Sequence, residues 1–115
     1  MILKATVFLN DENVGSLSKE KGMYFFNYTD SYFNNSTKKA ISLSLPKTNQ
    51  HFQSPILFPF FYNMLSEGAN RHLQCRLLKI DENDYFSLLL ATANEQTIGA
   101  ISIKEEKEIG SELGN

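Results

Sequence analysis

Two side chains in this sequence have the types and spacing of metal ligands or of a nucleophile with its base. His72 and Cys75 lie three residues apart, and on a helix this spacing places both on one face. The only other histidine is His51, and two neighbouring ligands are too few for a structural zinc site. A Cys–His catalytic pair is disfavoured as well, because the leucines around Cys75 are typical of a packed, inert thiol. The sequence therefore predicts no metal, no cofactor and no catalytic cysteine.

Nucleotide chemistry has no sequence signal either. A phosphate-binding loop needs clustered glycines, whereas Gly15, Gly22, Gly68 and Gly99 are far apart. Nothing resembles the catalytic loop or the metal-binding Asp motif of protein kinases. The carboxylates near the middle of the chain are most simply helix caps and solvated charges. We therefore expect no enzymatic activity.

The composition describes one globular domain of 115 residues, with 42% hydrophobic residues and 12% aromatic ones. The net charge of -2 and the pI near 5.6 disfavour direct binding to nucleic acid, which needs clustered Lys and Arg. A single cysteine excludes an internal disulfide and indicates a reducing compartment. No apolar run approaches the roughly 20 residues of a membrane span. We expect a cytoplasmic protein that contacts neither membrane nor nucleic acid directly.

Strands are predicted wherever apolar and polar residues alternate between turn-forming residues. The expected strands are Lys4–Leu9, Val14–Leu17, Met23–Tyr28, Ile41–Leu45 and Ile98–Ile103, with a polar linker at Lys47–Ser54. The alternation is clearest at Ile41–Leu45. The pattern indicates an α+β fold with a small, mainly antiparallel sheet that could close as a barrel, and about three short helices.

The stretch Phe58–Arg71 organises the rest of the chain. Pro59 suits the first turn of a helix, and Phe60, Phe61, Met64 and Leu65 then recur at helical spacing. Gly68 is a plausible left-handed stop. The sequence predicts a short aromatic helix anchored in the core, followed by a polar loop over Ser66–Arg71.

Two further helices are expected after this loop. The first covers Arg71–Lys79, with Leu73, Leu77 and Leu78 on one side. The second follows the capping residues Asp81–Asp84 and carries Phe86, Leu89, Leu90 and Ala93. The charged residues after Ile103 predict a frayed tail. The expected division is therefore a domain over residues 1–103 and a flexible tail over residues 104–115.

Four segments in this order resemble the N-terminal subdomain of HipA-type kinases. They read ISLSLP at Ile41–Pro46, FPFFYNMLSEGANR at Phe58–Arg71, DYFSLLLATAN at Asp84–Asn94 and IGAISI at Ile98–Ile103. One departure is Ser66, where that family usually has proline. The resemblance covers only the non-catalytic end of such a kinase, because this chain stops where the kinase body would begin.

The resemblance implies a small HipS-like antitoxin of a HipBST-type toxin–antitoxin system. Such a protein would bind and neutralise a separately encoded HipA-like Ser/Thr kinase toxin, and a helix-turn-helix DNA-binding protein would complete a ternary complex. The chain's natural-looking tail favours a complete small protein. The alternatives are a non-catalytic structural fragment of a HipA-type kinase and a nucleic-acid-binding accessory module.

The expected contact surface is the polar loop after the aromatic helix. It comprises Ser66, Glu67, Gly68, Asn70 and Arg71, and its cation could pair with acidic or phosphate groups of the partner. The rival surface is the expected strand Ile41–Leu45, whose edge could extend a partner's sheet.

Overall fold

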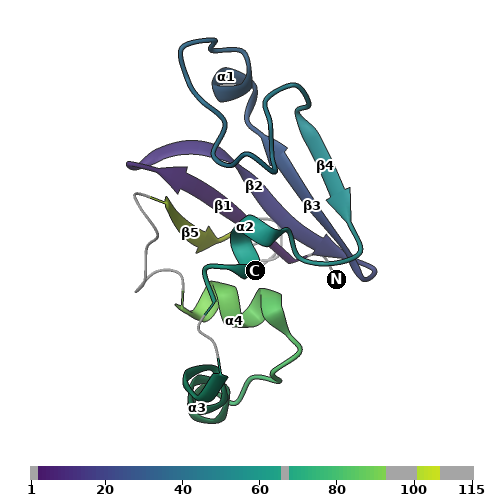
Figure 1. Ribbon diagram of the computed structural model, residues 1–115, viewed down its shortest axis with the longest axis vertical. Coiled ribbons are helices and arrows are strands. Elements are labelled where there is room, and N and C mark those ends of the chain that lie inside the picture. The colour runs from purple at the N-terminus through teal and green to yellow at the C-terminus, as the bar shows by residue number, and fades with distance from the viewer. Residues whose placement is uncertain (1–2, 66–67, 93–100, 107–115) are drawn as a thin grey trace, which may run out of the picture.

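The computed structural model describes residues 3–65, 68–92 and 101–106 and contains one five-stranded antiparallel sheet with the order β4-β3-β2-β1-β5 (Figure 1). The strands are β1 (Leu3–Leu9), β2 (Glu12–Glu20), β3 (Met23–Tyr28), β4 (His51–Ser54) and β5 (Ile101–Glu105). The helices are α1 (Asp30–Phe33), α2 (Pro59–Tyr62), α3 (Gly68–Leu78) and α4 (Tyr85–Thr92). The predicted α+β class with a small antiparallel sheet is confirmed. The sheet is open, because β4 and β5 form its two ends.

Two tight hairpins build the first three strands. The turn between β1 and β2 places Asn10 and Asp11 at φ 52° and 68°, and the turn between β2 and β3 places Lys21 and Gly22 at φ 52° and 77°. Two consecutive residues with positive φ match the right-handed twist of the flanking strands. Asn, Asp and Gly tolerate this conformation best, so the local sequence explains the first hairpin and Gly22 of the second, whereas Lys21 is an exception.

The core lies on one face of the sheet and is mainly aromatic. Alternate residues of β3 are buried, as a strand with one covered face requires. The Phe26 ring lies 5.7 Å from the Phe61 ring of α2, and the Tyr24 ring lies 6.4 Å from the Phe86 ring of α4. Helices α2 and α4 therefore cover the face of β3, and Figure 1 shows α2 in front of the sheet.

The expected strand at Ile41–Leu45 is wrong. These residues form bends and turns, and the Leu45 amide donates to the Ser42 carbonyl oxygen over 3.1 Å. The hydroxyl of buried Tyr28 accepts from the Ile41 amide over 3.1 Å and donates to the Leu45 carbonyl oxygen. Side-chain hydrogen bonds have thus replaced the backbone ladder that a strand would need.

The fourth strand comes instead from the expected polar linker, Lys47–Ser54. His51–Ser54 pairs with β3, with Phe52 opposite Phe26. Phe52 adds its ring to the core, 6.3 Å from the Phe26 ring. A polar segment becomes a strand here because an edge strand can leave one face and one set of backbone groups in water.

The aromatic helix is shorter than expected and the loop behind it is partly helical. After Tyr62 the chain tightens, because the amides of Met64 and Leu65 bond three residues back. Helix α3 begins at Gly68, so the predicted loop is wrong from Gly68 onward. Gly68 does have a left-handed φ of 56°. Ser66 and Glu67 lie outside the described residues.

Helices α3 and α4 differ sharply in burial. In α4 the buried side chains include Phe86, Leu88 and Leu89, and Asp84 caps the helix by accepting from the Ser87 amide over 3.2 Å. The capping prediction is confirmed, whereas Ala93 lies outside the described residues. In α3 only Cys75 is buried. Leu73, Leu77 and Leu78, which the sequence placed on one side of this helix, are exposed by 52%, 71% and 45%.

Strand β5 extends two residues beyond the expected end at Ile103. Glu105 pairs with Ala5, and the Glu106 amide donates to the Lys4 carbonyl oxygen over 2.9 Å. The division into residues 1–103 and 104–115 stays a prediction, since residues 107–115 lie outside the described part. None of the described helices has the length and apolar character required to cross a bilayer.

Candidate partner-binding surfaces

The two residues with the spacing of metal ligands lie in different environments. The His72 Nδ1 atom lies 2.7 Å from Glu82 Oε1 at the surface, whereas Cys75 is buried. Burial raises the pKa of the Cys75 thiol, which keeps it protonated and poorly nucleophilic. Across residues 3–65, 68–92 and 101–106, no three His, Cys, Asp or Glu side chains are grouped to hold a metal.

Arg71, the cation of the predicted contact surface, lies against two tyrosines. Its guanidinium carbon is 5.2 Å from the centre of the Tyr62 ring and 5.8 Å from that of Tyr85. Its Nη2 atom donates to the Tyr62 hydroxyl over 3.3 Å. The two rings meet edge to face with their centres 5.4 Å apart. Arg71 thus joins α3 to α2 and α4, since Tyr62 ends α2 and Tyr85 begins α4.

A hollow of about 310 Å³ lies beside this stack. Its lining residues are Ile56, Leu57, Pro59, Tyr62, Asn63 and Tyr85. Tyr62 and Tyr85 therefore contact Arg71 and also form part of the wall of the hollow. The guanidinium of Arg71 lies on the same two rings that form this wall. Such pockets, where an aromatic wall and an arginine meet, are typical binding hot spots.

The remaining residues of the predicted surface are divided. Gly68 and Asn70 are exposed in the first turn of α3 and precede Arg71 directly. Ser66 and Glu67 lie outside the described residues. We name the set of Gly68, Asn70, Arg71 and the hollow the Arg71 surface. Sequence reasoning missed the residues that line the hollow. The aromatic residues around Pro59 could have indicated it, but they were interpreted only as core residues.

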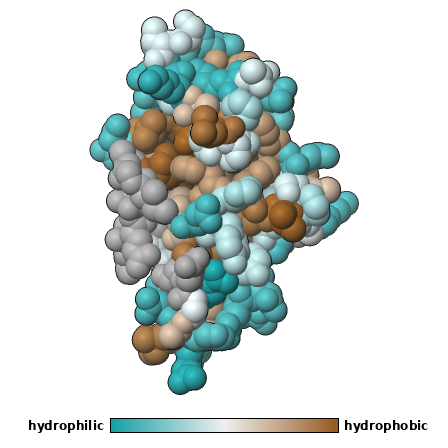
Figure 2. Space-filling model, in the orientation of Figure 1, coloured by the Kyte–Doolittle hydropathy of each residue, from teal (hydrophilic) through white to brown (hydrophobic). Residues whose placement is uncertain are grey.

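The rival surface cannot act as expected. Because Ile41–Leu45 is a series of turns, it has no strand edge to extend a partner's sheet. The ends of the sheet are β4 and β5. This segment nevertheless exposes the side chain of Leu43 completely. Figure 2 shows that one face of the molecule has hydrophobic side chains exposed among hydrophilic ones.

Comparison with known proteins agrees with the fold. The sequence matches the family described as HipA N-terminal domain over residues 5–104. An uncharacterised protein from Haemophilus influenzae is 33% identical over 108 residues, which cover 94% of this chain and 97% of that protein. A solved structure described as the N-terminal domain of HipA toxin has a TM-score of 0.72 and 28% identity, and the match covers 94% of this chain and 96% of that one.

Proposed function

Because the chain belongs to the HipA N-terminal domain family, we propose that it is an antitoxin that binds a separately encoded HipA-like Ser/Thr kinase and keeps it inactive. The observation that supports a separate protein best is the Haemophilus influenzae relative. That relative is matched over 97% of its own length, so it consists of this domain with hardly any additional chain. A helix-turn-helix DNA-binding protein would be the third member of the complex.

The inhibition follows from differential binding. A partner that binds the inactive kinase more tightly than the active kinase shifts the population in proportion to that preference. In a kinase that contains this domain, the covalent link supplies a high effective concentration. A separate chain must replace that link with its own affinity, and a stable interface buries about 1,600 Å² in total. The domain needs no catalytic group for this role.

The proposed contact is the Arg71 surface together with Ser66 and Glu67. The stack on Tyr62 and Tyr85 orients the Arg71 guanidinium, so less conformational entropy is lost when a partner binds. Planar guanidinium groups bind carboxylates and phosphates in a bidentate manner. Acidic side chains or phosphate groups on the kinase would supply the complementary anion.

The test uses the HipA-like kinase of the same organism, produced without an N-terminal subdomain of its own. The wild-type protein should bind this kinase and restore growth of cells that produce it. The variant Ile56→Glu places a charge in the hollow and should weaken both effects. Ile56 is exposed by 68%, so the fold should tolerate the change.

A second variant removes Asn70 and Arg71 together by substitution with Ala. Loss of the cation–π contacts costs about 0.5–1 kcal/mol of stability, and a thermal melt measures that cost separately. Arg76→Ala is the matched control, because Arg76 is exposed on the same helix and the change in charge is equal. If Ile56→Glu and the double variant both bind and protect as well as Arg76→Ala, the Arg71 surface is not the interface.

The same measurements separate the antitoxin from a structural fragment. A purely structural domain would bind the kinase body and leave its phosphorylation rate unchanged or raise it. An antitoxin lowers that rate in proportion to the fraction of kinase bound. Binding without inhibition would therefore reject the proposed function.

A further inference from the structure

Leu43 is the most exposed large apolar residue described, with an exposed fraction of 100%. It lies at the apex of a turn that its neighbours hold in shape. The Ser42 hydroxyl oxygen accepts from the Ser44 amide over 3.2 Å and lies 2.9 Å from the Ser44 hydroxyl. The Leu45 amide closes the turn on the Ser42 carbonyl oxygen. The side chain of Leu43 therefore projects from a closed turn.

Both ends of this turn are fixed to the core by one tyrosine. The Tyr28 hydroxyl bonds to the Ile41 amide and to the Leu45 carbonyl oxygen. Its ring is buried and stacks on the Tyr32 ring at 5.9 Å with an interplanar angle of 10°. Leu45 is buried beside the exposed apex. A turn held in this way loses little conformational freedom on binding, which favours affinity.

The surroundings of the turn are positively charged in a protein that is acidic as a whole. Residues 31–66 contain three lysines and no Asp or Glu, whereas the chain has a net charge of -2. Lys47 donates to the carbonyl oxygens of Asn35 and Lys38, each over 2.7 Å. Lys38 pairs with Glu12 over 3.1 Å, so two of the three positive charges are not neutralised by an ion pair within the described residues.

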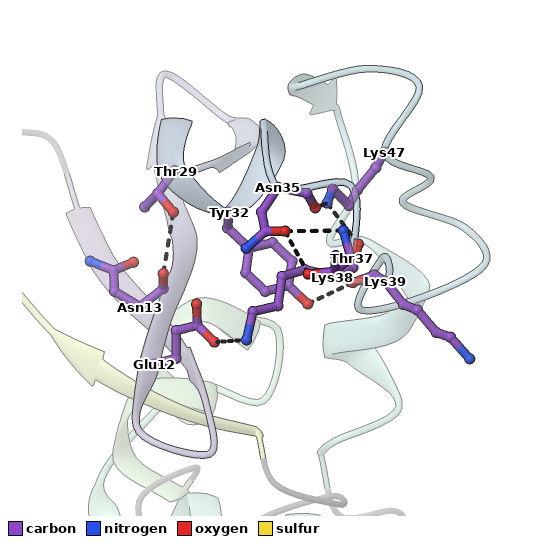
Figure 3. Close-up of polar contacts among 9 residues, drawn as sticks. All are labelled: Glu12, Asn13, Thr29, Tyr32, Asn35, Thr37, Lys38, Lys39 and Lys47. Atoms are coloured by element: carbon purple, nitrogen blue, oxygen red, sulfur yellow. Dashed lines mark hydrogen bonds and ion pairs between the residues drawn. The ribbon is translucent and has the colours of Figure 1, made fainter.

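The third lysine, Lys39, projects away from this network (Figure 3). Its backbone is fixed, because the Tyr32 hydroxyl donates to the Lys39 carbonyl oxygen over 2.6 Å. A hollow of about 760 Å³ runs along the same segment, with Lys39, Ile41, Leu43 and Lys47 among its lining residues. An apolar tip and two lysines, of which Lys47 is held by hydrogen bonds, thus line one hollow.

We propose that the turn Ile41–Leu45 is a second docking element, which inserts Leu43 into an apolar pocket bordered by carboxylates on a partner protein. This inference rests on the proposed function, in that the partner is the kinase. Charge complementarity selects an acidic border, because Lys39 and Lys47 line the same hollow as Leu43. A protein is favoured over nucleic acid, because a leucine at the centre offers no hydrogen bond to phosphates or bases. In protein interfaces, truncation of a side chain that fills a pocket causes the largest loss of binding free energy.

The test measures binding of the wild-type protein and its variants to the kinase described above, by titration calorimetry. Leu43→Ser should weaken binding at least about tenfold without lowering the melting temperature. Leu77→Ser is the matched control, since Leu77 is exposed by 71% on α3, and it should bind as the wild type does. Lys39→Glu should lower the association rate and reduce the dependence of that rate on salt.

A separate variant tests whether the Tyr28 hydroxyl positions the turn Ile41–Leu45. Tyr28→Phe keeps every surface side chain, so weaker binding by this variant supports preorganisation of the turn. A shift of the Ile41 and Leu45 amide resonances in its NMR spectrum would accompany the loss. If the two single variants Tyr28→Phe and Leu43→Ser both bind the kinase as tightly as the wild type does, the inference is overturned.

The outcomes separate this inference from the proposed function. If the wild type inhibits the kinase and Leu43→Ser does so equally well, the docking element is rejected and the antitoxin role stands. If the wild type does not bind the kinase, both the antitoxin role and the docking element are rejected. Binding to a labelled DNA duplex that Lys39→Glu abolishes and Leu43→Ser leaves intact would also overturn the inference, since it would assign this surface to nucleic acid.

Discussion

Removal of one oxygen atom, in Tyr28→Phe, gives the sharpest test of how this domain holds its long loop. The hydroxyl bonds to the Ile41 amide and the Leu45 carbonyl oxygen, and Tyr28 is 1% exposed. Without the hydroxyl, two backbone groups lose their partner beside the core. Such a loss costs about 1–3 kcal/mol for a buried group. We expect about 2 kcal/mol, because Ile41 is half-buried and water can replace part of its bond.

That loss is a large share of the total stability of a domain, which is about 5–15 kcal/mol. It should lower the melting temperature by roughly 8 °C or more. The chain has no tryptophan, so urea unfolding is followed by far-UV circular dichroism. Equal m-values would show that the variant changes stability and not the extent of unfolding.

The pH dependence gives an independent signature. Burial is the main cause that raises the pKa of Tyr28 above its usual value of 10.0. The folded state therefore keeps its proton at a pH where the unfolded state loses it. The stability that follows from this difference is complete below about pH 10 and is lost as the pH rises through the folded pKa. Tyr28→Phe should flatten this alkaline decline.

Tyr24→Phe is the matched control. Tyr24 is buried in the same strand, and its hydroxyl forms no hydrogen bond with the residues that the structure describes. Tyr24→Phe should keep the wild-type stability and the alkaline decline. If Tyr28→Phe and Tyr24→Phe unfold at the same urea concentration, the hydroxyl of Tyr28 does not fix the loop and the reasoning is refuted.

Three further predictions concern the core and the thiol. Phe61→Ala, at a fully buried position, should lower the free energy of unfolding in urea by about 3–5 kcal/mol. Phe60→Ala, at a half-buried position, should lower it clearly less. Equal losses would contradict the assigned burial. Gly15→Ala should lower the free energy of unfolding by about 1–3 kcal/mol, because a Cβ atom there would lie 2.4 Å from the Asn27 carbonyl oxygen. A melting temperature equal to that of the wild type would show that β2 and β3 can separate. Cys75 should react slowly with iodoacetamide at pH 8 and quickly in urea, since burial raises the pKa of its thiol; fast reaction of the native protein would contradict this.

Local sequence determined the elements whose information is local. Asn10, Asp11 and Gly22 tolerate positive φ, so both turns could be placed before any tertiary contact was known. Met23–Tyr28 alternates with a bulky residue at every buried position, and the expected strand has the observed bounds. Asp84 was recognised as a cap because a cap bonds within one helical turn. The order of four motifs was enough to indicate the family.

Only part of the candidate site could be predicted, because its geometry depends on contacts between elements that are separate in the sequence. Arg71 was chosen because of its charge and its place in a motif. Its stack on Tyr62 and Tyr85 depends on how α2, α3 and α4 meet, and the hollow beside it depends on Ile56 as well. Spacing along the chain contains no information about such contacts between elements.

Tertiary structure alone decided the outcome at Ile41–Leu45 and at His51–Ser54. The first segment has the better strand pattern, yet the Tyr28 hydroxyl and the serine side chains satisfy its backbone groups. The second has a poorer pattern and pairs with β3, because it is the segment that reaches the edge of the sheet. Alternation states only which side chains would share a face. A strand also needs a neighbouring backbone at hydrogen-bonding distance, and only the folded chain determines which segment has one.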